Sequence, residues 1–394
     1  MRLSQRAQSA EPFHAMAFGE QAGKLEAAGH HVIRLGLGEP DFGAPPAVRA
    51  AMREVMDGRP LPYTPAFGLP ALREAIAGFY RDRHGVPIDP ARIAVTPGAS
   101  GALLLAAAAT TDPGDEVILA DPSYPCNRQL VETFGGTVVT APTTPGSRYQ
   151  LDAAAVDRAW TDRTSAVMVA SPANPTGTSI PFTELVEVCR RAEARGAWRI
   201  IDEIYLDLAD PSADGTPPRT ILTADPDAIV INSFSKYFGM TGWRLGWCVL
   251  PPALVPAVER LAMNYFLCAS TPAQIAALSC FTPDSLAVCE ARRQELSARR
   301  AIALTGLAAI GLPVPVPPDG AFYIYFDVSP TGLTAWEFCR RALAEAHVAV
   351  TPGRDFGAQT AESHVRLSYT ASQADLREGL NRLATFVRSL PAAT

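Results

Sequence analysis

The chain has 394 residues, of which 48% are hydrophobic and 19% are charged, and its formal net charge is −6. These values predict a globular protein of two unequal domains, because one hydrophobic core rarely grows to this size and the apolar content is too high for a disordered chain. The acidic balance argues against nucleic acid or an anionic membrane as a partner, since either would attract a basic surface.

The cysteines and histidines show no pattern of a metal site. Seven cysteines are scattered without a Cys-x-x-Cys spacing, and the six histidines form no ligand pair at helical spacing. This favours reduced thiols over a disulfide framework. Residues 1–13 lack the apolar core of a signal peptide, and no uncharged apolar run reaches the ~18 residues that a membrane span needs. We therefore expect a cytoplasmic protein with no membrane partner.

The first part of the chain is predicted to form an arm and a helix over residues 15–29, followed by a short strand over residues 31–35. A glycine-rich turn over residues 36–42 ends the strand. Apolar residues at three- and four-residue spacing then predict helices over residues 45–58 and 70–84.

Between about residue 92 and residue 250, short apolar runs alternate with longer helical patterns. The seven runs are Ile93–Thr96, Glu116–Ala120, Thr137–Thr140, Ala166–Ala170, Arg199–Ile201, Ala228–Ile231 and Leu245–Leu250. Strands that are apolar on both faces and separated by helices predict an α/β fold with a mostly parallel seven-stranded sheet sandwiched by helices. Ligands of such sheets bind beyond the carboxyl ends of the strands. Chemically distinctive residues follow strand ends here, namely the turn 98–101, Tyr124, Asn174, Asp202 and Lys236.

The last part of the chain mixes helices with strands. Residues 252–310 read as largely helical, with one long helix over residues 286–310. The elements after it are a strand over 321–328, a helix over 335–346, short strands over 348–350 and 364–368, and a helix over 373–390. This mixture predicts a smaller α+β domain, with a boundary near residue 285.

Lys236 is one of only two lysines among the 34 basic residues, and the other is Lys24. A guanidinium stays protonated, whereas an ammonium can lose its proton, and only a free amine condenses with an aldehyde. The ordinary alternative is a solvated loop charge. Against it stands the surrounding pattern from Ser233 to Gly246, Ser-x-Ser-Lys-x-x-Gly-x-x-Gly-x-Arg-x-Gly, with hydroxyls and glycines at set offsets.

This pattern resembles the cofactor-lysine signature of the class I and II aminotransferases, which use pyridoxal phosphate (PLP). Further matches in family order are Gly-Glu-Pro-Asp-Phe at 38–42, Asn-Pro-Thr-Gly at 174–177, Asp-Glu-Ile-Tyr at 202–205 and Val-Arg-Leu-Ser at 365–368. The resemblance covers nearly the whole chain and implies the PLP fold type I. It also implies a large domain of residues 41–285 and a small domain made of residues 286–394 with the N-terminal arm, residues 1–40.

The resemblance gives the polar residues roles around the cofactor ring. Lys236 would form the Schiff base and later move the substrate proton as general acid and base. Asp202 would keep the pyridine nitrogen protonated, and Tyr205 and Asn174 would contact the phenolic oxygen of the ring. The alternatives are a helix cap for Asp202, core packing for Tyr205 and an ordinary Asn-Pro turn for Asn174.

A phosphate site is implied where residues 96–101 follow a strand and open a helix, because backbone N–H groups at a helix N-terminus bind dianions. The implied phosphate ligands are Ala99, Ser100, Gly101, Ser233, Ser235 and Arg244. The hydroxyl of Ser235 could instead cap the local turn.

Two tyrosines complete the cofactor set that the resemblance implies. Tyr124 would stack on the pyridine face, its alternative being an ordinary loop aromatic. Tyr63 matches a tyrosine that reaches the partner's phosphate, which implies a C2 homodimer with shared active sites.

Arg366 is the candidate for substrate recognition. An arginine between apolar residues in a short strand should have a carboxylate partner, and an internal salt bridge is the alternative. The resemblance implies that Arg366 clamps the substrate α-carboxylate, helped by the backbone of Gly38, with Tyr124 and Asn174 beside the same substrate. Gly38 could also be no more than a turn glycine.

The sequence therefore predicts a PLP-dependent aminotransferase that moves the amino group of an L-amino acid to a 2-oxo acid by a ping-pong mechanism. The apolar arm over residues 12–16 favours a neutral or aromatic donor, and an acidic acceptor such as 2-oxoglutarate is usual for the family. One alternative is a β- or γ-eliminating lyase, or a related synthase, with the same constellation. Another is a PLP-sensing regulator, which would need a basic DNA-binding domain before Gly36.

Overall fold

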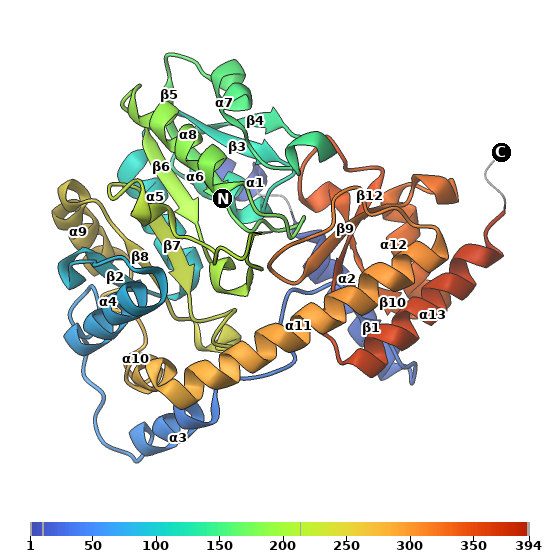
Figure 1. Cartoon of the computed structure of the whole chain (residues 1–394), viewed down its shortest axis with the longest axis horizontal. Coiled ribbons are helices and arrows are strands. Elements are labelled where there is room, and N and C mark those ends of the chain that lie inside the picture. The colour runs from blue at the N-terminus through green and yellow to red at the C-terminus, as the bar shows by residue number, and fades with distance from the viewer. Residues whose placement is uncertain (1, 10–11, 213, 392–394) are drawn as a thin grey trace.

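The computed structural model describes residues 2–9, 12–212 and 214–391, and its centre is a seven-stranded sheet (Figure 1). In sheet order the strands are β2 (Ile93–Thr96), β8 (Gly246–Val249), β7 (Ile229–Ser233), β6 (Trp198–Asp202), β5 (Thr164–Ala170), β3 (Glu116–Asp121) and β4 (Thr137–Pro142). Strand β8 is antiparallel to both of its neighbours, and the remaining pairs are parallel. The predicted mostly parallel sheet is confirmed.

Both faces of this sheet are buried because successive residues of each strand point to opposite sides. In β3, for example, Ile118 belongs to one hydrophobic cluster, whereas Val117 and Leu119 belong to another. The first cluster includes apolar residues of the helices α4 (Pro70–His84) and α8 (Phe182–Glu193). The second includes residues of α5 (Gly98–Thr110) and α9 (Val255–Tyr265). The continuous apolar runs in the sequence thus supply two cores.

The reversed direction of β8 brings its first residue to the edge where the parallel strands end. Gly246 pairs with Thr96 at the end of β2 and with Ser233 at the end of β7. A β-carbon on Gly246 would lie 2.7 Å from backbone atoms of Gly98 and Ala99 at the start of α5. Glycine at this position therefore lets the lysine motif and the first turn of α5 meet.

The long helix α11 (Pro283–Ile310) crosses the molecule from α10 (Thr271–Ala277) to α13 (Gln373–Ser389) (Figure 1). It begins three residues earlier than the sequence predicts, because the hydroxyl of Thr282 accepts a hydrogen bond from the Ser285 amide and Pro283 suits the first helical position. Gly311 ends the helix in the left-handed region, with φ of 81°.

The smaller part of the molecule has two small sheets. Its antiparallel sheet contains β11 (Thr351–Pro352), β12 (His364–Ser368) and β9 (Tyr323–Asp327), and its parallel pair contains β1 (Ile33–Arg34) and β10 (Val348–Ala349). The helices α2 (His14–Ala27), α12 (Ala335–Ala346) and α13 (Gln373–Ser389) pack on these strands.

Two expectations about this smaller part differ in detail from the structure. The strand predicted over residues 348–350 is found as β10, which pairs with β1, and a second short strand that the sequence did not predict, β11, follows it and pairs with β12. The boundary expected near residue 285 falls inside α11, which packs on elements of both parts. Since β1 lies in the small part, the N-terminal segment does join the C-terminal one, but the division into residue ranges stays a prediction.

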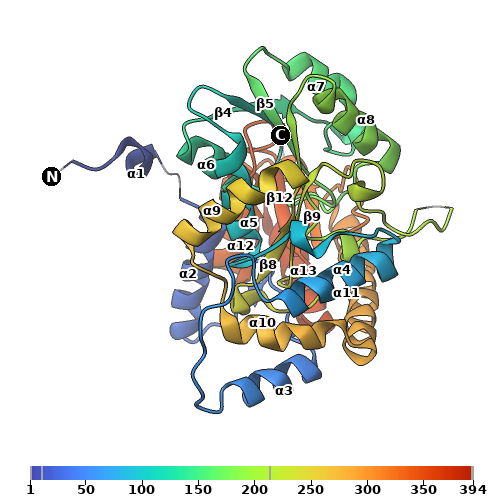
Figure 2. The ribbon, with the colours of Figure 1, turned by 90° about the vertical axis from the view of Figure 1, so that its left-hand side faces the viewer.

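The remaining α-helices are α1 (Gln5–Ser9), α3 (Pro46–Val55), α6 (Pro125–Thr133), α7 (Ala153–Ala159) and α10 (Thr271–Ala277). Helix α1 projects from the body of the molecule, and α10 packs on α3 (Figure 2). Within the described residues, no helix has the length and apolar character to cross a membrane.

Replacing Gly246 by alanine should destabilise the fold, because the new methyl group would meet backbone rather than a movable side chain. We expect G246A to lower the free energy of unfolding by ~1–3 kcal/mol, as overpacking does elsewhere. Urea denaturation measures this. Gly242→Ala is the matched control, since a β-carbon there meets nothing within 4 Å, and its stability should change by no more than ~0.5 kcal/mol. Equal stability of the two variants would contradict the proposed role of the close contact.

Candidate active site

One cavity of about 220 Å³ collects most of the residues that the sequence singles out. The predicted site residues that line it are Gly38, Ala99, Ser100, Tyr124, Asn174, Asp202, Tyr205, Ser233, Ser235, Lys236, Arg244 and Arg366. Most of them directly follow strands of the seven-stranded sheet, whereas Gly38 and Arg366 come from the smaller part. The cavity therefore lies where the carboxyl edge of the sheet meets the smaller part of the molecule.

The amine of Lys236 is held inside this cavity. Its Nζ donates a hydrogen bond of 2.8 Å to the carbonyl oxygen of Gly38. Desolvation lowers the pKa of Lys236 to about 8, and the guanidiniums of Arg366 and Arg244 act in the same direction. The carboxylate of Glu39 opposes this shift. A lysine with such a pKa can give and take a proton near neutral pH.

Asp202 ends β6 as a buried carboxylate. Among the described residues, one hydrogen bond reaches its side chain, from the Ile204 amide to Oδ1 at 3.1 Å. Burial raises the pKa of Asp202 to about 6, and the positive charge of Lys236 only partly offsets this. A buried carboxylate with so little compensation fits a cationic group of a ligand, such as a protonated ring nitrogen.

Two buried tyrosines meet beside these groups. The hydroxyls of Tyr205 and Tyr323 lie 3.1 Å apart, and the two rings pack edge to face with centroids 5.8 Å apart. Burial raises the pKa of both phenols, so both keep their protons and can donate hydrogen bonds. Tyr323 also lines the cavity.

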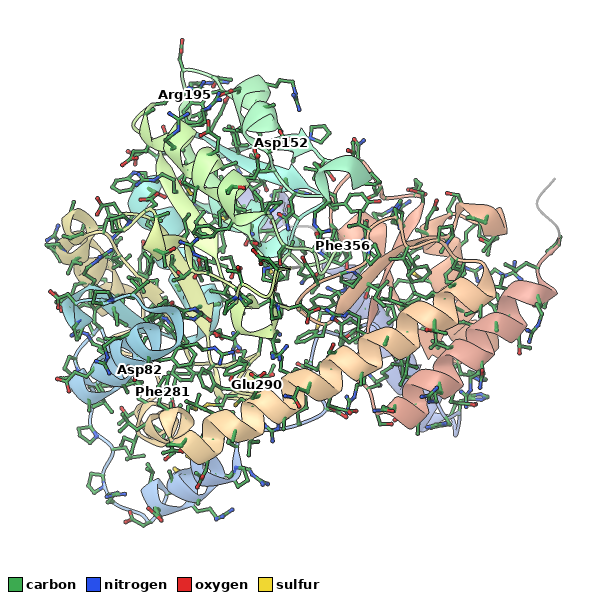
Figure 3. All side chains as sticks on the ribbon, viewed as in Figure 1. Asp82, Asp152, Arg195, Phe281, Glu290 and Phe356 are labelled. Atoms are coloured by element: carbon green, nitrogen blue, oxygen red, sulfur yellow. The ribbon has the colours of Figure 1, made fainter. Side chains whose placement is uncertain are left out.

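Arg366 lies in the middle of β12 and is fully buried. Its Nη1 donates to Asn174 Oδ1 at 2.8 Å, and its Nη2 donates to the Gly36 carbonyl at 2.6 Å. Its guanidinium carbon lies 4.5 Å and 4.8 Å from the ring centroids of Tyr323 and Phe356. Phe356 is found where the two parts of the chain meet (Figure 3). No carboxylate of the described residues pairs with Arg366, so a substrate carboxylate can take that place.

The lysine motif and the start of α5 form the other end of the cavity. Arg244 has a left-handed backbone (φ 53°), and its Nη1 donates to the Thr241 carbonyl at 3.0 Å. A β-carbon on Gly98 would lie 2.6 Å from Arg244 Nη2. The hydroxyl of Ser233 accepts a hydrogen bond from the Ser235 amide at 3.0 Å. A guanidinium, two hydroxyls and a helix N-terminus together fit a phosphate group.

An apolar arm borders the same cavity. Phe13 lies edge-on to Tyr124, with ring centroids 6.4 Å apart. The first turn of α2, which follows Phe13, is fixed to the small domain because both carboxylate oxygens of Asp355 accept backbone hydrogen bonds, from His14 at 2.9 Å and from Ala15 at 2.8 Å. The arm is thus held at the cavity by a buried carboxylate.

Two predicted cofactor residues lie elsewhere. Gly101 is buried in the first turns of α5 and does not line the cavity, because its Cα faces Pro97 and Thr96. Tyr63 is 79% exposed, in the loop between α3 and α4. Its expected role needs a second subunit, so exposure in the single chain leaves that expectation untested.

Several cavity residues were given no role in the site from the sequence, although Glu39 and Thr241 lie within motifs that it singles out. Tyr323, Glu39, Leu37, Leu103 and Thr241 line the cavity, yet they sit in runs that read as strand, turn or helix. Tyr323 in particular lies in an apolar strand where a core role is the simplest interpretation. The one related signal in the sequence is the motif glycine Gly38. A β-carbon at that position would lie 1.7 Å from the Tyr323 hydroxyl oxygen, so the glycine leaves room for the tyrosine.

These groups fit PLP at each of its functional parts. A buried lysine amine, an uncompensated buried carboxylate, paired phenols and a phosphate-sized polar end lie in one cavity beyond a parallel sheet. The fold and the site therefore define a PLP-dependent enzyme of fold type I.

Comparison with known proteins agrees with this class. Residues 30–383 match the family model of class I and II aminotransferases. The chain is 39% identical to a valine–pyruvate aminotransferase of Mycobacterium tuberculosis, and the alignment covers 96% of this chain and 97% of that protein. It is 37% identical to an aspartate/prephenate aminotransferase of Thermus thermophilus, with coverages of 97% and 98%.

Solved structures give the same result. An aminotransferase from Mycobacterium tuberculosis matches with a TM-score of 0.94 and 38% identity, over 99% of this chain and 100% of that one. The aspartate aminotransferase of Thermus thermophilus with maleate matches with a TM-score of 0.91 and 36% identity, over 98% and 100%. The chain belongs to the class I and II aminotransferases and is a PLP-dependent aminotransferase.

The lowered pKa of Lys236 can be measured in a variant with a single side-chain amine. Lys24→Arg leaves Lys236 as the sole lysine. In cofactor-free K24R, the rate of Lys236 modification by trinitrobenzenesulfonate, followed by peptide mapping, should rise with a midpoint near the pKa of about 8. Adding Asp202→Asn should move the midpoint down, because that carboxylate raises the pKa of Lys236. A midpoint near the ordinary 10.5 would contradict the desolvated environment.

Proposed function

We propose that this aminotransferase takes its amino group from a neutral L-amino acid with a branched or aromatic side chain and gives it to a neutral 2-oxo acid. The observation that carries the proposal is the charge of the cavity lining. Of its two guanidiniums, Arg244 lies at the phosphate end and Arg366 beside Asn174, so a single arginine is left for substrate carboxylates. A substrate with a second carboxylate would find no partner of its own among the described lining residues.

The apolar part of the cavity lining supports the same substrate class. The lining residues Phe13, Met16, Leu37 and Leu103 are all hydrophobic. Burying a branched or aromatic side chain against such surface contributes on the order of 1.5–3 kcal/mol. A carboxylate side chain would instead be desolvated there at a cost.

The two relatives with the highest identity reported above have names that differ on this point. Valine and pyruvate each carry one carboxylate, whereas aspartate carries two. The cavity lining of this chain favours a donor and an acceptor that each carry a single carboxylate. The acidic acceptor that is usual for the family is then expected to react more slowly than pyruvate.

The residue roles belong to the same proposal. When bound, PLP supplies an aldehyde that takes up the substrate nitrogen and a ring that accepts electron density from Cα. Asp202 keeps a proton on the ring nitrogen, while Tyr205 and Asn174 donate hydrogen bonds to the phenolic oxygen. The amine of Lys236 would take the proton from the substrate Cα and deliver it to the cofactor carbon that carried the aldehyde, and in the second half of the cycle it would move a proton in the reverse direction.

Positioning of the substrate is assigned to Arg366. Its guanidinium is fixed by Asn174, by the Gly36 carbonyl and by two aromatic rings, so little side-chain entropy remains to be lost on binding. A carboxylate clamped there leaves the Cα–H bond near the Lys236 amine. The arm with Phe13 limits the access of water.

A homodimer with shared sites is a further part of the proposal. Tyr63 and Met56 are exposed, and the Tyr63 loop lies beside α10, where Thr271 Oγ1 donates to the Pro62 carbonyl at 2.9 Å. Both are among the large hydrophobic residues that the described chain exposes, and a subunit interface would cover such side chains. A cytoplasmic location is also proposed, since all seven cysteines are free thiols, as in a reducing compartment.

Donor and acceptor can be identified by separate half-reactions. Each amino acid is added to the holoenzyme, and loss of the visible cofactor absorbance is followed. Valine, leucine and phenylalanine should react with kcat/KM at least ~10-fold above that of aspartate, because an unpaired buried carboxylate costs more than ~1.4 kcal/mol. Pyruvate should restore the absorbance faster than 2-oxoglutarate. Preference for aspartate and 2-oxoglutarate would refute the assignment, and ammonia release without an oxo acid would indicate elimination.

The variant Phe13→Ala tests the role of the arm in that assay. Loss of the ring should reduce kcat/KM for phenylalanine and leucine by ~10-fold, since it removes apolar contact on the order of 1.4 kcal/mol. Activity with alanine, whose side chain is too short to reach the arm, should change little. An equal loss for all donors would indicate a general structural defect instead.

Shared sites can be tested by mixing two defective variants. Lys236→Ala should be inactive, and Tyr63→Phe should bind the cofactor ~10-fold more weakly through loss of a hydrogen bond to the phosphate. A hybrid dimer of the two would contain one site with both native residues. At a cofactor concentration well below the Kd of Y63F, activity of the mixture per subunit above that of either variant is the expected result. A monomer in sedimentation equilibrium, or no gain on mixing, would argue against shared sites.

A further inference from the structure

Tyr323 lies at the point where the two parts of the chain meet in the cavity. It begins β9 in the small domain, and its hydroxyl is 3.1 Å from that of Tyr205 in the large part. Its ring centroid is 4.5 Å from the guanidinium carbon of Arg366. One side chain therefore contacts both the proposed cofactor ligand and the proposed substrate ligand.

Tyr323 packs closely against two glycines, at positions where a larger residue would not fit. A β-carbon on Gly38 would lie 1.7 Å from the Tyr323 hydroxyl oxygen, and one on Gly177 would lie 2.5 Å from the Tyr323 carbonyl oxygen. Gly38 holds the Lys236 amine through its carbonyl, and Gly177 closes the turn that carries Asn174. The hydroxyl of Tyr323 thus occupies space that only a glycine at position 38 leaves free, and the backbone of Tyr323 packs against Gly177.

We propose that Tyr323 is a positioning residue that links the Arg366 carboxylate clamp to the Tyr205 hydroxyl and so adjusts the hydrogen bond that Tyr205 gives to the cofactor. This inference rests on the roles assigned above to Tyr205 and Arg366. It adds a residue and a coupling that those roles do not include.

The direction of the hydrogen bond follows from the number of protons. A phenol has one O–H donor and accepts through its lone pairs. If Tyr205 gives its proton to the phenolic oxygen of the cofactor, the proton between the two tyrosines must come from Tyr323. Donation by Tyr323 polarises the Tyr205 O–H bond and strengthens the bond that Tyr205 makes.

The coupling to substrate follows from the contact with Arg366. The cation attracts the electron-rich face of the Tyr323 ring. A substrate carboxylate on Arg366 neutralises this cation, so the hydroxyl of Tyr323 becomes a weaker donor to Tyr205. The titratable and charged groups around Tyr323 are Tyr205, Tyr124, Arg366 and Glu39.

The test is an absorbance titration of the holoenzyme against pH, with Tyr323→Phe compared with the native protein. Removing the hydroxyl should weaken the bond from Tyr205 to the phenolic oxygen, which favours the protonated form of the cofactor. The spectroscopic midpoint should therefore rise by ~0.5 pH unit. Saturating 3-methylbutanoate, an unreactive monocarboxylate, should shift the native midpoint upward and shift that of Y323F less.

Tyr325→Phe is the matched control. Tyr325 lies on the same strand and is equally buried, and its hydroxyl bonds Thr360 Oγ1 at 2.7 Å outside the cavity. Y325F should lose similar thermal stability to Y323F but keep the native midpoint and the native response to 3-methylbutanoate. An unchanged midpoint in Y323F, or equal shifts in both variants, would overturn the inference.

Tyr205→Phe separates this inference from the proposed function. If Y205F raises the midpoint while Y323F does not, the role of Tyr205 stands and the coupling through Tyr323 fails. If neither variant moves the midpoint, both the role of Tyr205 and the coupling through Tyr323 are overturned. The titration needs no turnover, so an unexpected amino donor leaves its outcome unaffected.

Discussion

At Gly246 the backbone of β8 lies against the first turn of α5 with no room for a side chain, and the polar end of the cavity depends on this contact. Strand β8 runs opposite to its neighbours, so its start, rather than its end, is at the carboxyl edge of the sheet. Arg244 therefore meets the helix N-terminus at Gly98. Two segments far apart in the sequence become one phosphate-sized site.

Electrostatics inside the cavity follow from burial. Desolvation lowers the pKa of Lys236 and raises that of Asp202, so both groups are brought closer to neutrality than they would be in water. Buried charges of this kind lower the stability of the fold, because apolar residues of similar size at these positions would avoid the free-energy cost of desolvation. The two groups are explained if a ligand binds between them and offers a cationic group to Asp202 and an anionic or electrophilic group to Lys236.

The site also depends on the contact between the two parts of the chain. Gly38, Tyr323 and Arg366 come from the small part, whereas Lys236 and Tyr205 come from the large one. Hydrogen bonds join them across this contact, from Lys236 to Gly38 and between the two tyrosines. Any relative movement of the two parts would thus change the geometry of substrate and cofactor ligands together.

The sequence by itself determined the central sheet, most of the helices and most of the residues that line the candidate site. Hydrophobic periodicity is a local property, and residues that follow parallel strands must meet at one edge, so Asn174, Asp202 and Lys236 could be placed together in advance. Tertiary structure alone decided that Tyr323 enters the cavity, that Gly101 does not line it and that Asp355 holds the arm. These contacts join distant segments through side-chain packing, for which a linear sequence carries no periodic signal.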